Sequence, residues 1–194
     1  MSLHLATTDH GNALLEHDPL ALMLGMLLDQ QIPMEKAFTS PSVLAERMRV
    51  DRLDAAQIAA LPPEDLVELF RTPPALHRFP GSMAERTQQL CQALVEHWDG
   101  DAAAVWRGAD SGAELVRRVG TLPGFGAQKA KIFVALLAKQ FGVRPAGWQE
   151  ATGDYGKDGF RSIADVVDDA SKAKVREFKK EMKARAKAAT AAGA

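Results

Sequence analysis

A short turn at residues 122–126 carries the features of a phosphate-binding site. Gly124 and Gly126 stand one residue apart, so the backbone can bend sharply there and approach another group closely. A helix is expected to begin after Gly126, and the first N–H groups of a helix have no partners within it. These N–H groups and the helix dipole favour an anion. The pattern predicts a grip on a phosphate backbone that is independent of base sequence.

Basic side chains around this turn favour a phosphate ligand. Lys129 and Lys131 follow it, and Arg117 and Arg118 precede it. A turn that only reversed the chain would not need these cations. Spacing alone leaves that simpler interpretation open, because glycine and proline are also sufficient for a tight link between two helices.

Helices must hold the turn in place. Residues 111–120 and 127–141 carry apolar side chains at helical spacing on either side of it. Upstream, Asp18-Pro19 begins a helix, since Asp is a favoured N-cap and proline fits the first helical position. That helix, 20–31, is apolar nearly all round, which predicts burial on every side. It ends in Asp29-Gln30-Gln31, whose amides are either satisfied internally or look out of the core.

The rest of the chain also predicts helices, and no stretch alternates as a strand would. We therefore expect an all-α fold, with 194 residues forming one domain or two small lobes that share a core. Capping and proline signals predict further helices at 34–38, 40–50, 54–60, 63–71, 82–98, 147–151 and 162–167.

Two segments near the C-terminus differ in composition. Residues 143–160 form a long glycine-rich segment, and such loops are more often functional than idle. Residues 171–189 form a regular helix with eight Lys or Arg and two Glu between Lys172 and Lys187, a balance of +6. That helix is either a solvated surface or a face for phosphates. The tail 190–194 is expected to be frayed.

Composition excludes several classes of site. The net charge is −1, so a surface for nucleic acid must be local. A single cysteine, Cys91, excludes a disulfide framework, a cysteine zinc site and a four-cysteine iron–sulfur cluster within the chain. The histidines show no metal-ligand spacing, and we expect no catalytic metal ion. Residues 1–11 do not resemble a signal peptide and no apolar run could span a membrane, so we expect a cytoplasmic protein without membrane contact.

Several stretches, in this order, resemble the helix–hairpin–helix, Gly/Pro-Asp (HhH-GPD) superfamily of base-excision DNA glycosylases. Residues 27–32, Leu-Leu-Asp-Gln-Gln-Ile, look like a Gln-Gln-Ile helix end in its alkylated-base branch. Residues 82–86 are similar to the helix that follows there. Residues 115–122 fit the approach to the hairpin, and Leu-Pro-Gly-Phe-Gly at 122–126 is similar to the hairpin itself. The resemblance covers 18–141 and suits a short bacterial group without an iron–sulfur cluster.

The resemblance implies a two-lobed all-α fold with DNA across the cleft. We expect an N-terminal extension at 1–17 and a glycosylase-like domain at 18–189, with the hairpin unit at 111–141. The implied partner is double-stranded DNA with a damaged base, bound by a monomer without cofactors. A monovalent cation often assists the hairpin carbonyls in this family, here those of Leu122 and Gly124.

The family pattern also implies which residues contact DNA. A side chain at Gln30 or Gln31 would wedge into the duplex while the damaged base is flipped out, which costs on the order of a few kcal/mol. The hairpin and the helix after it would hold phosphates. The implied DNA-binding residues are Gln30, Gln31, Leu122, Gly124, Phe125, Gly126, Gln128, Lys129 and Lys131.

Two positions depart from the family pattern. Strand-cleaving members carry a lysine where this chain has Gln128, and Lys129 beside it should point about 100° away on the helix. We therefore expect no strong strand cleavage by that route. The family's catalytic aspartate should lie near Ala146, where there is no carboxylate. We expect Asp154 to take this role because it closes the Gly/Pro-rich loop, with Asp165 as second choice, although either can be a cap or loop carboxylate.

Three functions are compatible with these residues. The first, which we favour, is a monofunctional glycosylase that hydrolyses the N-glycosidic bond of a damaged, for example alkylated, base. The second is a non-catalytic protein of the same fold that binds DNA or its lesions, which the missing carboxylate favours. The third is a helical interaction module with a purely structural hairpin, against which the basic residues around Leu122 argue.

Overall fold

The computed structural model describes the backbone of residues 3–192 and the side chains of residues 3–189. Within that part there is no strand, only an isolated parallel bridge between Ser111 and Ala146. Three 3-10 turns, η1 (Ala102–Val105), η2 (Gly153–Gly156) and η3 (Ile163–Asp165), join the helices. The helices are α1 (Asp9–His17), α2 (Pro19–Leu28), α3 (Met34–Met48), α4 (Ala55–Ala60), α5 (Pro63–Arg71), α6 (Pro80–Trp98), α7 (Gly112–Gly120), α8 (Ala127–Gln140), α9 (Trp148–Thr152) and α10 (Asp169–Ala192).

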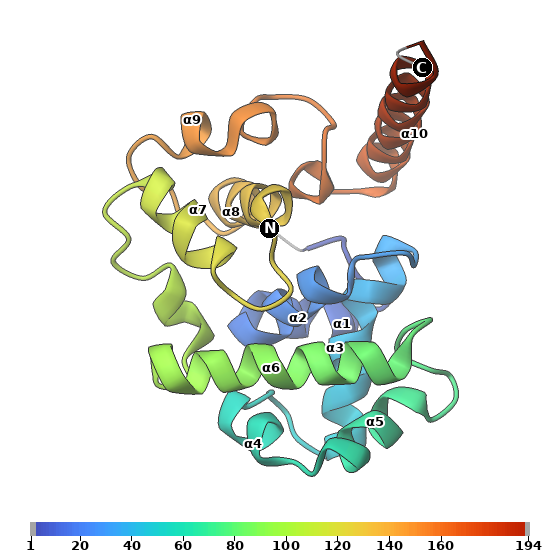
Figure 1. Cartoon of the computed structure of the whole chain (residues 1–194), viewed down its shortest axis with the longest axis vertical. Coiled ribbons are helices and arrows are strands. Elements are labelled where there is room, and N and C mark those ends of the chain that lie inside the picture. The colour runs from blue at the N-terminus through green and yellow to red at the C-terminus, as the bar shows by residue number, and fades with distance from the viewer. Residues whose placement is uncertain (1–2, 193–194) are drawn as a thin grey trace.

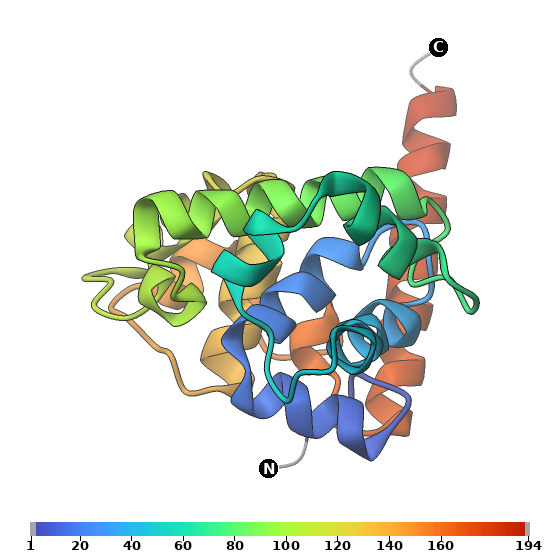
Figure 2. The same cartoon turned by 90° about the horizontal axis from the view of Figure 1, so that it is seen from below.

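Helix α2 lies between two groups of helices (Figure 1). Every residue from Leu20 to Leu28 is buried, as its apolar pattern predicts. Helices α4, α5 and α6 form one end of the molecule, while α7, α8 and α9 form the other. Helix α10 extends beyond the body of the protein in both Figure 1 and Figure 2. The expected all-α, two-lobed fold with a helix–hairpin–helix unit is confirmed.

Side-chain caps begin several helices at the predicted residues. Asp18 Oδ1 accepts two amides in the first turn of α2, at 3.0 and 3.1 Å. Its other oxygen accepts the amide of Leu53 at 2.7 Å, which ties α2 to the segment before α4. Asp54 and Ser111 cap α4 and α7, each through an amide three residues on. Short-range polar signals therefore set the boundaries that present the hairpin.

Several helix bounds differ from the prediction. The helix expected at 162–167 is the short turn η3, and α10 begins at Asp169, two residues earlier than expected. Ser40 and Pro41 lie inside α3, where the Ser40 hydroxyl donates to the carbonyls of Lys36 and Leu76, each at 2.8 Å. A proline inside a helix removes one backbone hydrogen bond, and the burial of Pro41 offsets that loss. Helix α6 begins at Pro80 instead of Ser82, because proline fits the first helical position.

The two ends of the chain join the fold differently. Leu5 and Leu15 are buried in the common core, so residues 3–17, expected as an extension, share that core with the domain. The backbone of 190–192, expected to fray, continues α10, and 193–194 lie outside the described residues. No described helix has both the length and the apolar character required to span a membrane.

Candidate active site beside the hairpin

A cavity of about 450 Å³ lies where the end of α2, the start of α8 and the middle of α10 meet. Residues from the glycine-rich segment after α8 complete its wall. The apolar part of the lining is Met26, Ile132, Phe178 and Met182, and the polar part is Asp29, Gln128, Lys129, Asp154, Tyr155, Arg161 and Lys179.

The hairpin packs its backbone directly against α2. Gly124 has φ +83°, a conformation that side chains disfavour, and a Cβ there would lie 2.1 Å from Leu27 Cδ1. Gly126 precedes α8 without a capping side chain, and the space where its Cβ would point is empty to 4 Å. Glycine is therefore needed at 124 for packing, while 126 leaves the start of α8 open to an anion.

The two large hairpin side chains serve the core. Leu122 and Phe125 are both buried, and the Phe125 ring meets Phe133 edge to face at 5.7 Å between centroids. Of the expected DNA-binding residues, these two can meet a ligand only through their backbone. Their packing fixes the hairpin on α8.

Gln128 and Lys129 both line the cavity, although they are neighbours on one helix. The Gln128 amide donates to the Tyr155 hydroxyl at 2.8 Å, and the Lys129 ammonium donates to the Leu27 carbonyl at 2.8 Å. Burial lowers the pKa of Lys129 to about 8, against the opposing effect of Asp29. Neighbouring residues on a helix point about 100° apart, and the sequence therefore predicts that Lys129 cannot take the place of Gln128. The cavity is wide enough to include both side chains, so Lys129 lies in the site.

Asp29 follows the last residue of α2 and faces the same cavity. Burial raises the pKa of its carboxyl above the ordinary value, while Lys179 and Lys129 act to lower it. Asp29 and Lys129 thus attract each other, yet burial shifts both toward their neutral forms. Titratable groups perturbed in this way, in a concave site, are candidates for proton transfer.

The two glutamines after Asp29 have different surroundings. Gln30 is half-buried, donates its amide to the Leu27 carbonyl at 2.9 Å and accepts from Arg86 at 3.1 Å. Its backbone carbonyl lies 2.9 Å from His77 Nε2. Gln31 is exposed and has φ +58°, a rare conformation for a residue other than glycine. Gln30 therefore braces the end of α2, whereas the side chain of Gln31 is exposed beside it.

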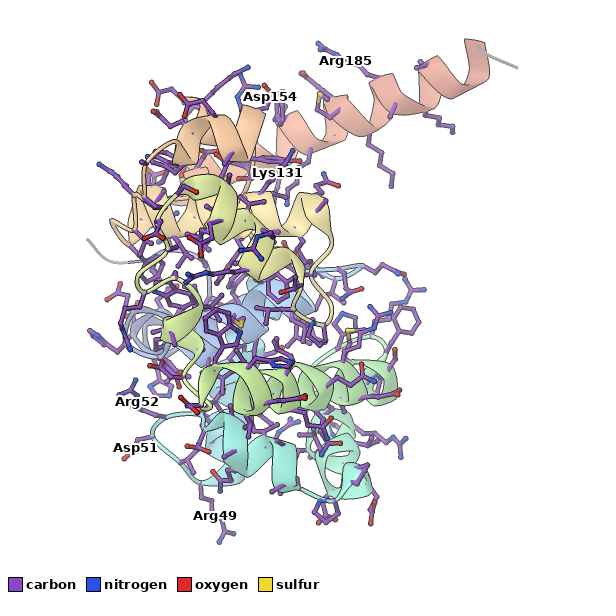
Figure 3. The ribbon with its side chains drawn as sticks, turned by 60° about the vertical axis from the view of Figure 1, so that its left-hand side comes forward. Arg49, Asp51, Arg52, Lys131, Asp154 and Arg185 are labelled. Carbon is purple, nitrogen blue, oxygen red and sulfur yellow. The ribbon has the colours of Figure 1, made fainter. Side chains whose placement is uncertain are left out.

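The two carboxylates expected to be catalytic lie in different places. Asp154, labelled in Figure 3, is exposed on the η2 turn. It also lines the cavity. A hydrogen bond from Lys157 at 2.6 Å lowers its pKa. Asp165 is not among the residues that line this cavity. It pairs with Lys139 at 2.5 Å and accepts the amide of Arg161, so it holds η3 against α8.

The other basic residues near the hairpin lie outside the cavity. Lys131, labelled in Figure 3, is exposed on α8. It is not among the residues that line the cavity. Arg118 pairs with Glu114 at 2.5 Å and covers the Trp98 ring, so it secures α7. The sequence pattern does not place Asp29, Arg161 or Lys179 together, and the fold brings all three to this cavity from segments distant in the chain.

A comparison with protein families identifies the fold. A family model described as HhH-GPD superfamily base excision DNA repair protein matches residues 24–190. The chain belongs to this family. Family membership assigns the protein to base excision DNA repair and gives DNA as its partner. Neither the curated proteins nor the solved structures searched contain a match.

The family pattern implies a monovalent cation at the hairpin carbonyls. The Leu122 carbonyl accepts the Phe125 amide at 3.1 Å, and a carbonyl oxygen has a second lone pair that an ion can use. Oxygen donors suit such a hard cation. No group of three or more His, Cys, Asp or Glu side chains gathers as a metal site in the part of the chain that the structure describes.

Proposed function

We propose that this family member is a monofunctional DNA glycosylase that hydrolyses the N-glycosidic bond of a damaged base in double-stranded DNA. One observation carries the proposal: the cavity beside the hairpin combines a desolvated carboxylate, Asp29, with aromatic and apolar walls. Flipped bases are held by stacking on such walls, and Tyr155 and Phe178 supply them here. The volume of about 450 Å³ suits a small ligand.

Asp29 has the properties of a general base. Its raised pKa favours proton uptake from a water molecule. The oxygen of that water forms a bond to C1′ of the sugar as the N-glycosidic bond breaks, and the departing base takes a proton from solvent. The carboxylate also stabilises positive charge that develops on the sugar.

Asp154 is the second candidate for this role, because it lines the same cavity. Its pairing with Lys157 lowers its pKa, so it is a weaker base than Asp29. Asp165 is third, since it is engaged with Lys139 elsewhere. Access to the cavity therefore places Asp29 and Asp154 before Asp165, and basicity places Asp29 before Asp154.

A second candidate activity is cleavage of the abasic strand by Lys129. With a pKa of about 8, this amine has a substantial neutral, nucleophilic fraction near that pH. Its nitrogen would add to the aldehyde carbon C1′ of an abasic sugar and lose water to form an imine. Loss of a 2′ proton then expels the 3′ phosphate, and water releases the amine.

Two assays test these activities. Duplexes with alkylated, deaminated or oxidised bases are incubated with the protein and then treated with alkali, which breaks the strand wherever a base has been released. Alkali-dependent breaks support the glycosylase, whereas tight lesion binding without breaks supports the non-catalytic alternative. Borohydride reduces an imine to a stable bond, so a covalent protein–DNA product that Lys129→Met abolishes supports the lyase, and its absence from the wild type excludes it.

A further inference from the structure

The C-terminal helix carries a basic surface that the proposed active site leaves unused. Helix α10 has 24 residues, and its distal half extends away from both lobes (Figures 1 and 3). Every side chain from Lys179 to Ala189 is exposed. In Figure 3, Arg185 points away from the body of the protein.

Most cations of α10 lie on one face. At about 100° per residue, six of the eight fall within one arc of about 100° around the helix axis. The packed side chains Val175 and Phe178 lie beyond one edge of this arc, on the side of Lys179. Glu177 and Glu181 lie beyond the other edge. We call the six residues the basic stripe: Lys172, Arg176, Lys179, Lys180, Lys183 and Lys187.

The near end of the stripe is engaged with acids and the far end is not. Lys172 pairs with Asp169, and Arg176 pairs with Glu35. Lys179 lines the cavity. The ion pairs formed among the described side chains include neither Lys183 nor Lys187. The stripe therefore leads from the cavity to a row of cations without acidic partners.

The spacing of three lysines in the stripe destabilises the free helix. Lys179, Lys183 and Lys187 follow one another at intervals of four residues. Like charges at this interval repel each other on a helix. Arg185, on another face, instead has Glu181 four residues before it. A bound anion would relieve the repulsion along the stripe. The same anion would stabilise the helix less at Arg185, because Glu181 already offsets the charge of that side chain.

We propose that the basic stripe binds the phosphates of duplex DNA on one side of the damaged base. The inference rests on DNA as the family's partner and not on the proposed base release. From Lys172 to Lys187 the stripe is about 22 Å long, at about 1.5 Å per residue. This equals about six base-pair steps of about 3.4 Å. Lys179 belongs to both the cavity and the stripe, so the duplex can follow the stripe outward from the site.

A membrane surface fits the helix less well. Helices that lie in a membrane interface insert Trp, Phe or Leu side chains. Between Met182 and Ala189 the only apolar residues beyond Met182 are alanines. The distal half thus offers charge without an inserting face, which suits a phosphate backbone.

The test compares two cations on the same helix, Lys183 and Arg185, which are separated by one residue. Lys183→Gln removes one stripe cation, and Arg185→Gln removes one from another face. Both residues are exposed and keep good helix formers when changed, so helix content should be unaffected. Affinity for a long undamaged duplex is measured by fluorescence anisotropy at several salt concentrations. Lys183→Arg, which retains the charge, completes the set.

We expect Lys183→Gln to weaken duplex binding about 3- to 10-fold at low salt and to make the salt slope less negative by about 0.9. Lys183→Gln with Lys187→Gln should double the change in slope. Arg185→Gln and Lys183→Arg should bind as the wild type does, and base release at saturating duplex should remain unchanged in all of them. Equal losses of duplex affinity in Lys183→Gln and Arg185→Gln would overturn the proposal, as would unchanged salt slopes. Binding of the same variants to vesicles that contain phosphatidylserine is measured in parallel. A loss confined to vesicle binding would also overturn the proposal.

Discussion

The ammonium nitrogen of Lys129 lies 2.8 Å from the carbonyl oxygen of Leu27, so a side chain of α8 caps the end of the central helix α2. The Gln30 amide donates to the same oxygen at 2.9 Å. Asp29 enters the cavity immediately after this point. The hairpin helix therefore positions the carboxylate that we propose as the base, in addition to presenting the hairpin to DNA.

The lowered pKa of Lys129 predicts a pH-dependent contribution to stability. Between pH 8 and 10.5 the unfolded chain binds more protons at this side chain than the folded chain does. Stability rises with pH in such a window, so the wild type should gain stability relative to Lys129→Met. Thermal unfolding of both proteins from pH 7.5 to 10 measures this. Lys131→Met provides the matched control, because it replaces an exposed lysine of the same helix that does not line the cavity.

The raised pKa of Asp29 predicts that its ionised carboxyl destabilises the folded protein. Its raised pKa means that ionised Asp29 is less favourable in the folded protein than in the unfolded chain, so Asp29→Asn should be more stable than the wild type at neutral pH. The wild type should regain this difference as the pH falls through the raised pKa. Asp154 has a lowered pKa, so Asp154→Asn should show the reverse trend. Denaturant midpoints of the three proteins from pH 7 to pH 3 decide this, and parallel curves would contradict it.

Substitutions of the two hairpin glycines should have different effects, one on stability and the other on DNA binding. Gly124→Ala places a Cβ against Leu27 at φ +83°, and should destabilise the protein by about 1–3 kcal/mol. Gly126→Ala points into open space and should cost less than about 1 kcal/mol. Its methyl group lies where a phosphate would approach the start of α8, so duplex affinity should fall. A Gly126→Ala protein with wild-type affinity would show that α8 does not hold a phosphate.

We expect the exposed side chain of Gln31 to assist base flipping. Gln31→Ala removes the exposed amide at the end of α2 without removing a described hydrogen bond, so folding should be retained. If this side chain fills the gap in the duplex, the variant should flip the base less well. Fluorescence of 2-aminopurine beside a lesion reports the loss of stacking. A signal equal to that of the wild type would assign the wedge to another residue.

The sequence predicted the features that depend on neighbouring residues. The Asp18 and Ser111 caps and the all-apolar α2 follow local rules, and all three are present. The Ser40-Pro41 pattern predicts a helix start, whereas the structure has this proline buried inside α3. Burial depends on distant contacts, which the local pattern does not reveal.

The candidate site depended on contacts between distant residues. Asp29 is unusual only as a carboxylate ending an apolar helix, and its desolvation arises from α8 and α10. Lys179 lies about 150 residues later and reaches the same cavity, which no local spacing can predict. Asp154 was predicted because it closes the loop, and it does line the cavity, but its basicity depends on Lys157.

The rate of base release by Asp29→Asn tests the central claim most directly. With the lesion that the wild type excises, single-turnover release should fall by about 10²-fold or more in Asp29→Asn, while duplex affinity is retained. Asp154→Asn should keep most of the wild-type rate. Release at the wild-type rate by Asp29→Asn, together with its loss in Asp154→Asn, would contradict the assignment of Asp29 and make Asp154 the catalytic carboxylate.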